Sequence, residues 1–190
     1  MAVNIKEWGT FKDSLKEPVF NWFTYPAGFS HKAVKYSIRE EHLSKSSVIY
    51  DPFMGSGTTN LVAKTMGINS IGVEAHSFVY PIAKSKLNWD INENCVKEHI
   101  DFITRKIASE TTNEEKIQKI LTDEFPELVN KCYLPQTLYE ILQIRNYISN
   151  IEDDEIKLFM RVALIGTLRD VSIAATGWPY IAPNKIKVTS

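Results

Sequence analysis

Apolar residues follow two different spacings in the first half of the chain. Two short runs rich in β-branched and aromatic residues, VIYDPF (48–53) and NSIGVEA (69–75), predict strands, and VIYDPF is expected to be buried. Residues 31–43, 58–66 and 76–89 carry apolar positions at helical spacing instead. Strands that alternate with helices in this way predict a parallel sheet with right-handed crossovers.

Local signals at the helix ends agree with this pattern. Ser30 is a suitable N-cap for the first helix, and Gly67 stands where a helix-ending glycine belongs. Residues 1–30 are rich in aromatics and punctuated by prolines. We expect them to form an irregular segment that packs its rings against the domain.

The second half of the chain carries helical spacing only. The predicted helices cover residues 92–110, 113–122, 136–149 and 153–172. No further convincing strand appears before the end of the sequence. The chain therefore has two predicted strands, whereas a doubly wound sheet generally needs about five or more.

These patterns predict an α/β fold followed by an all-helical region. Residues 1–91 are expected to form the aromatic segment and an α/β half-domain. Residues 92–176 are expected to form a helical insertion or subdomain, and residues 177–190 a carboxyl-terminal tail.

Composition narrows the class of protein only slightly. The 190 residues are 44% hydrophobic and 24% charged, as in ordinary globular proteins, and no apolar run approaches the ~20 residues of a membrane span. Cys95 and Cys132 fit neither a metal knuckle nor a disulfide framework, which favours a reducing cytoplasm. The net charge of −1 lacks the basic excess of a dedicated nucleic-acid binder, so a DNA contact would need a local patch or another polypeptide.

The candidate chemistry begins with DPFMGSGTT, which directly follows the first predicted strand. In open parallel sheets, ligands bind where a strand ends and the chain turns into the next helix. Gly55 and Gly57 can adopt positive φ and let a ligand approach the backbone closely. Thr58 and Thr59 then open a helix whose free N–H groups face the same crevice.

Three classes of ligand compete for such a turn. A phosphate-binding P-loop requires a lysine directly after Gly57, and the dinucleotide motif requires a third small residue where Asn60 stands. S-adenosylmethionine fits better, because Asp51 can hold its ammonium group while the amides of the turn take its carboxylate. Glu74 ends the second predicted strand about 20 residues further on, where a carboxylate can accept hydrogen bonds from both ribose hydroxyls.

DPFMGSGTT also resembles the S-adenosylmethionine-binding motif of the amino-methylating DNA methyltransferases, which modify the exocyclic amine of adenine or cytosine. Every fixed position from Asp51 to Thr59 agrees with that motif. The segments Trp22 to Glu41 and Val73 to Leu87 are similar to its flanks, so the resemblance covers residues 20–90. It implies a partial Rossmann-like methyltransferase fold, DNA as substrate and a role in restriction–modification.

By this resemblance, the cofactor site is built from the turn, the acid and an upstream wall. The implied cofactor-binding residues are Tyr25, Pro26, Asp51, Pro52, Phe53, Gly55, Ser56, Gly57, Thr58, Thr59 and Glu74. No metal ligand is expected, because the histidines lack metal spacing and methyl transfer needs no metal.

The family's second motif, [DNS]PP[YFW], holds the amine to be methylated, and the chain has no match to it. The nearest segment is GWPY, in which Gly177 replaces the polar acceptor and Trp178 replaces the first proline. Tyr180 is the one catalytic candidate that this leaves, and no catalytic residue is assigned. The sequence thus predicts the amino-terminal part of a methyltransferase, with the catalytic half beyond residue 190 or on a second polypeptide.

Two alternatives stay open. The chain is either a catalytic part of such an enzyme or a non-catalytic module that binds S-adenosylmethionine or a protein partner. A small-molecule methyltransferase of the same fold is disfavoured, because GSGTT after DPF is closer to the DNA-acting enzymes.

Overall fold

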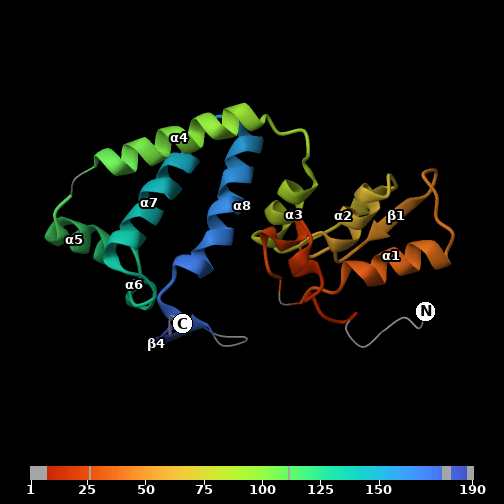
Figure 1. Cartoon of the computed structure of the whole chain (residues 1–190), viewed down its shortest axis with the longest axis horizontal. Coiled ribbons are helices and arrows are strands. Elements are labelled where there is room, and N and C mark those ends of the chain that lie inside the picture. The colour runs from red at the N-terminus through yellow and green to blue at the C-terminus, as the bar shows by residue number, and fades with distance from the viewer. Residues whose placement is uncertain (1–7, 26, 111, 177–180, 188–190) are drawn as a thin grey trace. The chain divides into compact units, whose positions relative to one another are not determined.

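The computed structural model describes residues 8–25, 27–110, 112–176 and 181–187 (Figure 1). The chain forms two compact units, unit 1 (Met1–Ile91) and unit 2 (Asn92–Ser190). Unit 1 is α/β with a small parallel sheet, and unit 2 is mainly helical. No helix among the described residues has the length and apolar character to cross a membrane.

The described part of unit 1 has the predicted order of helices and strands. Its elements are η2 (Ser14–Lys16), η3 (Phe20–Trp22), α1 (His31–Glu40), β1 (Val48–Asp51), α2 (Thr58–Thr65), β2 (Asn69–Gly72) and α3 (Val79–Leu87). β1 and β2 pair in parallel, with Val48 opposite Asn69 and Asp51 opposite Gly72. The predicted parallel pairing is therefore confirmed.

The expected helix ends of unit 1 are also confirmed. The side chain of Ser30 accepts a hydrogen bond from the backbone N–H of Lys32, which satisfies one of the free donors at the start of α1. Gly67 follows α2 with a φ of +70°, a conformation that suits glycine.

The core of unit 1 lies on one face of its sheet, where α1 and α2 pack against each other (Figure 1). The amino-terminal segment contributes two buried rings to it, as expected. The buried cluster contains Phe11, Phe20, Val34, Ile38, Leu61, Val62, Ala63 and Ile68, and Ile49 of β1 packs against it.

The other face of this sheet is exposed, and the prediction that VIYDPF is a buried strand is wrong. Val48 and Tyr50 are 60% and 62% exposed, and Ile71 and Val73 are 57% and 48% exposed. Side chains alternate between the faces of a strand, so Ile49 points to the core and its neighbours point away from it. We call these four exposed residues the open sheet face.

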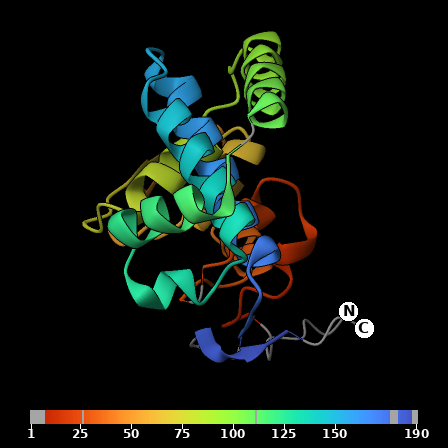
Figure 2. The same cartoon turned by 90° about the vertical axis from the view of Figure 1, so that its left-hand side faces the viewer.

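Unit 2 is built from five described helices, three of which begin with side-chain caps. The five helices are α4 (Glu93–Ser109), α5 (Glu114–Glu124), α6 (Glu127–Asn130), α7 (Pro135–Ser149) and α8 (Asp154–Val171). The side chains of Asn92, Asn113 and Asp153 accept backbone N–H groups at the starts of α4, α5 and α8. α7 packs beside α8 and against α5, where Ile117, Leu121, Leu138, Tyr139 and Leu142 form a buried cluster (Figures 1 and 2).

The expectation of an all-helical region without further strands is wrong. β3 (Ala174–Thr176) and β4 (Ile181–Ile186) form an antiparallel pair after α8. The backbone N–H of Ile173 donates to the carbonyl of Cys132, which anchors the pair beside the start of α7. β3 has three residues and β4 contains Pro183, so neither offers the sustained alternation by which a strand is recognised.

Candidate cofactor site

The turn between β1 and α2 holds two glycines in conformations that few other residues adopt. The φ of Gly55 is +52° and that of Gly57 is +85°. Backbone hydrogen bonds fix the turn from both sides, since Met54 N–H donates to the carbonyl of Val73 and Gly57 N–H donates to that of Met54. The sequence-based expectation of positive φ at both glycines is confirmed.

Close neighbours give these glycines a second reason to lack a side chain. A Cβ at Gly55 would lie 2.8 Å from Cε1 of Tyr25, and a Cβ at Gly57 would lie 3.1 Å from Cβ of Ala83 in α3. The ring of Tyr25 therefore lies directly against the turn. The upstream segment and the glycine turn, about 30 residues apart in the sequence, form one surface.

Glu74 reaches the same turn from the end of β2. Its Oε2 accepts a hydrogen bond from the backbone N–H of Gly55 at 2.9 Å, and its Oε1 accepts one from His76 N–H at 2.7 Å. The carboxylate and the paired glycines thus lie at the same end of the sheet, within reach of one bound molecule.

The remaining residues of the turn divide into buried and exposed groups. Gly55, Ser56, Gly57 and Thr58 are buried, whereas Pro52 is exposed and Thr59 is intermediate. Oγ of Ser56 has no hydrogen-bond partner among the described residues. No side chain caps α2, so its first N–H groups keep their capacity for a ligand.

Asp51 and Phe53 lie at the rim of the turn. Oδ1 of Asp51 accepts a hydrogen bond from Phe53 N–H at 3.0 Å, which closes a local turn. The ring of Phe53 is 87% exposed. An aromatic side chain this exposed offers a face on which a flat ligand or another protein segment can pack.

An aromatic wall continues from Tyr25 along the upstream segment. The ring centroid of Tyr25 lies 6.4 Å from that of Phe23. The ring of Phe23 in turn lies 6.0 Å from that of Phe78, in an edge-on arrangement. Phe78, which directly precedes α3, is 44% exposed. Phe78 was not among the residues expected from the sequence, although HSF (76–78) places an aromatic ring four residues after Glu74.

Behind this wall, α3 buries a lysine. Lys86 is 1% exposed, and its Nζ donates to the carbonyl of Phe20 at 3.2 Å and lies 5.8 Å from the ring centre of Phe11. Burial disfavours the charged form and lowers the pKa of Lys86 from 10.5 to about 8. The ion pairs of the described residues include none with Lys86.

Two of the residues implied by the resemblance lie outside the described residues, Pro26 and Tyr180. Among the described ones, the structure brings Tyr25, Gly55 and Glu74 into direct contact, and Asp51 belongs to the same turn. No group of three or more potential metal ligands occurs in the described part of the chain.

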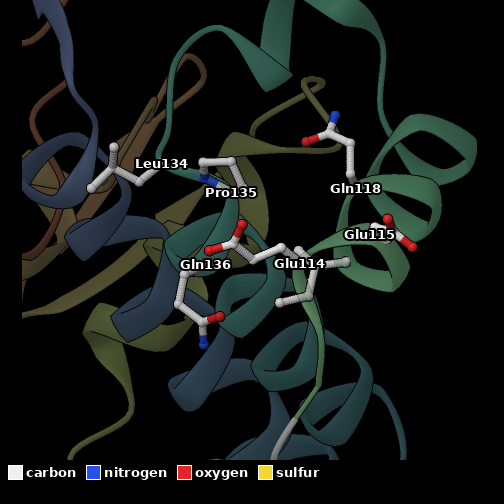
Figure 3. Close-up of a pocket in the computed structure, with 7 residues that line it drawn as sticks. Glu114, Glu115, Gln118, Leu134, Pro135 and Gln136 are labelled. Atoms are coloured by element: carbon white, nitrogen blue, oxygen red, sulfur yellow. The ribbon is translucent and has the colours of Figure 1, made fainter.

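Cavities elsewhere involve other residues. One of about 300 Å³ lies between α2, β2 and α3 and is lined by Asn60, Ser70, Tyr80 and Lys84, with Oδ1 of Asn60 unpaired among the described residues. Another, in unit 2, measures about 530 Å³ and lies between the starts of α5 and α7 (Figure 3). Its lining includes Glu114, Glu115, Gln118, Leu134, Pro135 and Gln136 and none of the implied cofactor residues.

Comparison with known proteins agrees with the geometry of unit 1. Residues 6–85 match a family model described as DNA methylase, which covers the glycine turn, Glu74 and the aromatic segment. The matched residues, 6–85, are related to the amino-methylating DNA methyltransferases, and the named relatives agree with this.

The relatives that the chain matches are considerably longer. The chain is 29% identical to the type II methyltransferase M.BsoBI of Geobacillus stearothermophilus over 177 residues, which are 90% of this chain and 33% of that protein. It is 32% identical to M.MjaII of Methanocaldococcus jannaschii over 157 residues, 78% of this chain and 28% of that protein. The chain thus spans about a third of the length of these methyltransferases. No solved structure matches it significantly.

Proposed function

We propose that the chain is the S-adenosylmethionine-binding part of a DNA methyltransferase that acts on the exocyclic amine of adenine or cytosine. One observation carries this proposal: Glu74 accepts a hydrogen bond from Gly55, so the acid and the glycine turn belong to one site. The relatives are named type II methyltransferases, which supports the same reaction class.

The residues present fit this cofactor. Both glycines of the turn have positive φ, and the uncapped start of α2 with the unpaired Ser56 Oγ offers polar groups to a carboxylate. Asp51 would hold the ammonium group, and Glu74 would accept the ribose hydroxyls. When bound, the cofactor supplies a methyl group made electrophilic by its sulfonium.

The aromatic wall would close the site. Tyr25 lies against the turn, and Phe23 and Phe78 continue from it, so apolar rings flank the space beside Glu74. Such rings exclude water and offer stacking surfaces for a flat base. Pro26 would extend this wall.

We infer that the sheet of unit 1 is part of a larger Rossmann-like sheet. Parallel sheets occur almost only with both faces covered, yet the open sheet face leaves four apolar side chains about half exposed or more. The remaining part of the methyltransferase, in the same polypeptide or in a second one, would cover this face and supply [DNS]PP[YFW]. It would also supply most of the contact with DNA. The cytoplasm is the proposed location of the enzyme.

A methyl-transfer assay with labelled S-adenosylmethionine tests this function. We expect the chain alone to bind the cofactor weakly and to leave bare DNA unmethylated, because its pocket and sheet are incomplete. Adding a polypeptide that carries [DNS]PP[YFW] and is encoded beside it should restore transfer. The variant Glu74→Gln, which keeps the size of the side chain, should lose at least about tenfold in cofactor affinity, because a neutral amide cannot replace a charged acceptor.

Two results would count against the proposal. Micromolar cofactor binding together with methylation of bare DNA by the chain alone would refute the need for a second part. Cofactor binding without transfer in every combination would favour the alternative, a non-catalytic module, which the altered GWPY segment (Gly177 to Tyr180) supports.

A further inference from the structure

Lys86 occupies a position where an apolar residue is expected. Val79, Ile82 and Ala83 of α3 are buried, and Lys86 continues their i, i+3, i+4, i+7 stripe at 1% exposure. A charge in such a place lowers stability unless its contacts compensate for lost hydration. The contacts of its ammonium group therefore indicate what the lysine does.

Among the described residues, these contacts lead to the amino-terminal aromatic segment. Nζ of Lys86 donates to the carbonyl of Phe20, 66 residues earlier in the chain, and the ring of Phe11 lies beneath it. The bond runs to backbone, so it fixes the path of the segment and does not depend on the side chain at position 20.

The backbone at this point is strained. Val19 has a φ of +68° and a ψ of −42°, and Phe20 N–H donates to the carbonyl of Pro18 at 2.8 Å, which together form a tight γ-turn. A β-branched residue at positive φ is rare and costs free energy. Burial of Phe20 and the bond from Lys86 help to hold this turn in place, together with bonds from Asn21 N–H to the Glu17 carbonyl and from Trp22 N–H to the Val19 carbonyl.

The strained turn leads directly into the aromatic wall. Phe23 follows Phe20 by three residues and packs on Phe78, and Tyr25 follows by five and packs on Gly55. Lys86 therefore fixes one end of a short segment whose other end lies on the glycine turn.

We propose that Lys86 is a positioning residue of the cofactor site, which holds the Phe20 carbonyl so that Phe23 and Tyr25 stay closed over the glycine turn. The cofactor part of this inference rests on the proposed function. The bond from Lys86 to the Phe20 carbonyl, which we call the tether, does not rest on it, because the tether concerns the order of the segment in the free protein.

A purely structural lysine and a tether predict different behaviour for Lys86→Met. Replacing a buried charge by an apolar side chain of similar length is often neutral or stabilising, so the unfolding midpoint should stay equal or rise. If Lys86 is a tether, the segment should nevertheless loosen. Lys84→Met is the matched control, since Lys84 lies on the same helix but is exposed.

Backbone amide hydrogen exchange, measured by mass spectrometry, distinguishes a purely structural lysine from a tether. In Lys86→Met, peptides covering residues 19–25 should exchange at least tenfold faster than in the unaltered chain, while those of α2 keep their protection. Lys84→Met should leave both unchanged. Unchanged exchange at 19–25 in Lys86→Met, or equal loosening of the whole of unit 1, would overturn the tether.

The charge on the ammonium group provides a second test. Between pH 7 and 9, exchange at residues 19–25, corrected for its intrinsic rate, should fall in the unaltered chain and stay flat in Lys86→Met, because burial lowers the pKa of Lys86 and loss of its charge favours the closed segment. The other titratable groups around this segment are His31, Glu17, Asp13 and Lys32. Burial lowers the pKa of His31 and the bond from Lys32 lowers that of Asp13, so both titrate below this range. A pH response retained in Lys86→Met would assign it to another group and refute the role of the ammonium.

Adding S-adenosylmethionine separates this inference from the proposed function. If the unaltered chain protects residues 53–58 when the cofactor is added, Lys86→Met should need about tenfold more cofactor for the same protection. Equal cofactor requirements would refute a positioning role. Absence of protection in the unaltered chain even at a large excess of cofactor counts against the proposed function and leaves the exchange comparison in the free protein decisive for the tether.

Discussion

Three helices of unit 2 begin at side-chain caps and the unit encloses its own apolar cluster, whereas unit 1 contains positive-φ glycines, a strained valine and a buried ammonium group. Asn92, Asn113 and Asp153 each satisfy backbone donors at a helix start. In unit 1, α2 starts without a side-chain cap and next to the unpaired hydroxyl of Ser56.

This difference shows where each unit departs from local stability rules. Sequences generally satisfy such rules wherever nothing else is required, and break them where function imposes another demand. The departures in unit 1 gather around one turn and the segment that covers it. Unit 2 therefore has the ordinary features of a helical subdomain, whereas unit 1 departs from local stability rules around the proposed cofactor site.

The largest expected effect concerns the pH dependence of the two units. The pKa of Lys86 is about 8 in the folded chain and 10.5 ordinarily, so between pH 8 and 10 the unfolded chain binds more protons than the folded one. The free energy of unfolding of unit 1 should therefore rise with pH through this window, by about 3 kcal/mol when fully developed. Lys86→Met should remove this rise.

The free energy of unfolding of unit 2 should instead fall with pH, and it should do so at higher pH. Burial raises the pKa of Tyr133 and of Tyr147, so above pH 10 the unfolded chain releases phenolic protons that the folded chain retains. Urea unfolding can follow both units, because Trp8, Trp22 and Trp89 lie in unit 1 and most helical residues lie in unit 2. In a Trp178→Phe background, tryptophan fluorescence should report a free energy of unfolding that rises between pH 8 and 10, and far-ultraviolet circular dichroism one that falls above pH 10. The same pH response in both signals would contradict the predicted difference between the units.

A second prediction compares two glycines that share positive φ but differ in surroundings. Gly55→Ala must accept an αL conformation and place Cβ 2.8 Å from the ring of Tyr25. We expect this to lower the free energy of unfolding of unit 1 by about 2 kcal/mol. Gly67→Ala meets only Lys45 Cε at 3.5 Å and should lose about 1 kcal/mol. Urea unfolding followed by tryptophan fluorescence measures both.

A double-mutant cycle isolates the contact with the ring. In the background of Tyr25→Ala, the loss caused by Gly55→Ala should fall to that of Gly67→Ala, because only the backbone term remains. An unchanged loss in that background would show that the ring is not what constrains Gly55.

The regular elements of unit 1 were predictable because each has a local cause. Ser30 and Gly67 mark helix ends by their own chemistry, and the short apolar runs mark β1 and β2. The placement of Gly55 and Glu74 at one end of the sheet follows from parallel pairing, in which strand ends meet at the same edge.

The features that the sequence did not predict depend on contacts distant in the chain. Lys86 reads as a solvated charge until the buried stripe of α3 is seen to include it. The exposure of Val48 and Tyr50 could not be predicted, since a short apolar run does not show how many sheet faces are covered. β3 and β4 depend on pairing with each other and on the anchor at Cys132.

The smallest predicted effect belongs to unit 2 and tests whether its stability is as ordinary as its caps indicate. Oδ1 of Asp153 accepts hydrogen bonds from Glu155 N–H at 2.9 Å and Ile156 N–H at 3.0 Å. Asp153→Ala should lower the free energy of unfolding of unit 2 by about 1 kcal/mol, while Asp153→Asn, another good cap, should keep most of it. The neighbouring Asp154 makes only an exposed ion pair with Lys157, so Asp154→Ala is the control and should lose less than about 0.5 kcal/mol.

Circular dichroism should report the loss while the fluorescence of unit 1 stays unchanged, because a cap acts only within its own helix. If Asp153→Ala also lowered the unfolding midpoint of unit 1, the two units would be one cooperative structure, and strain around the glycine turn would be supported by the whole chain.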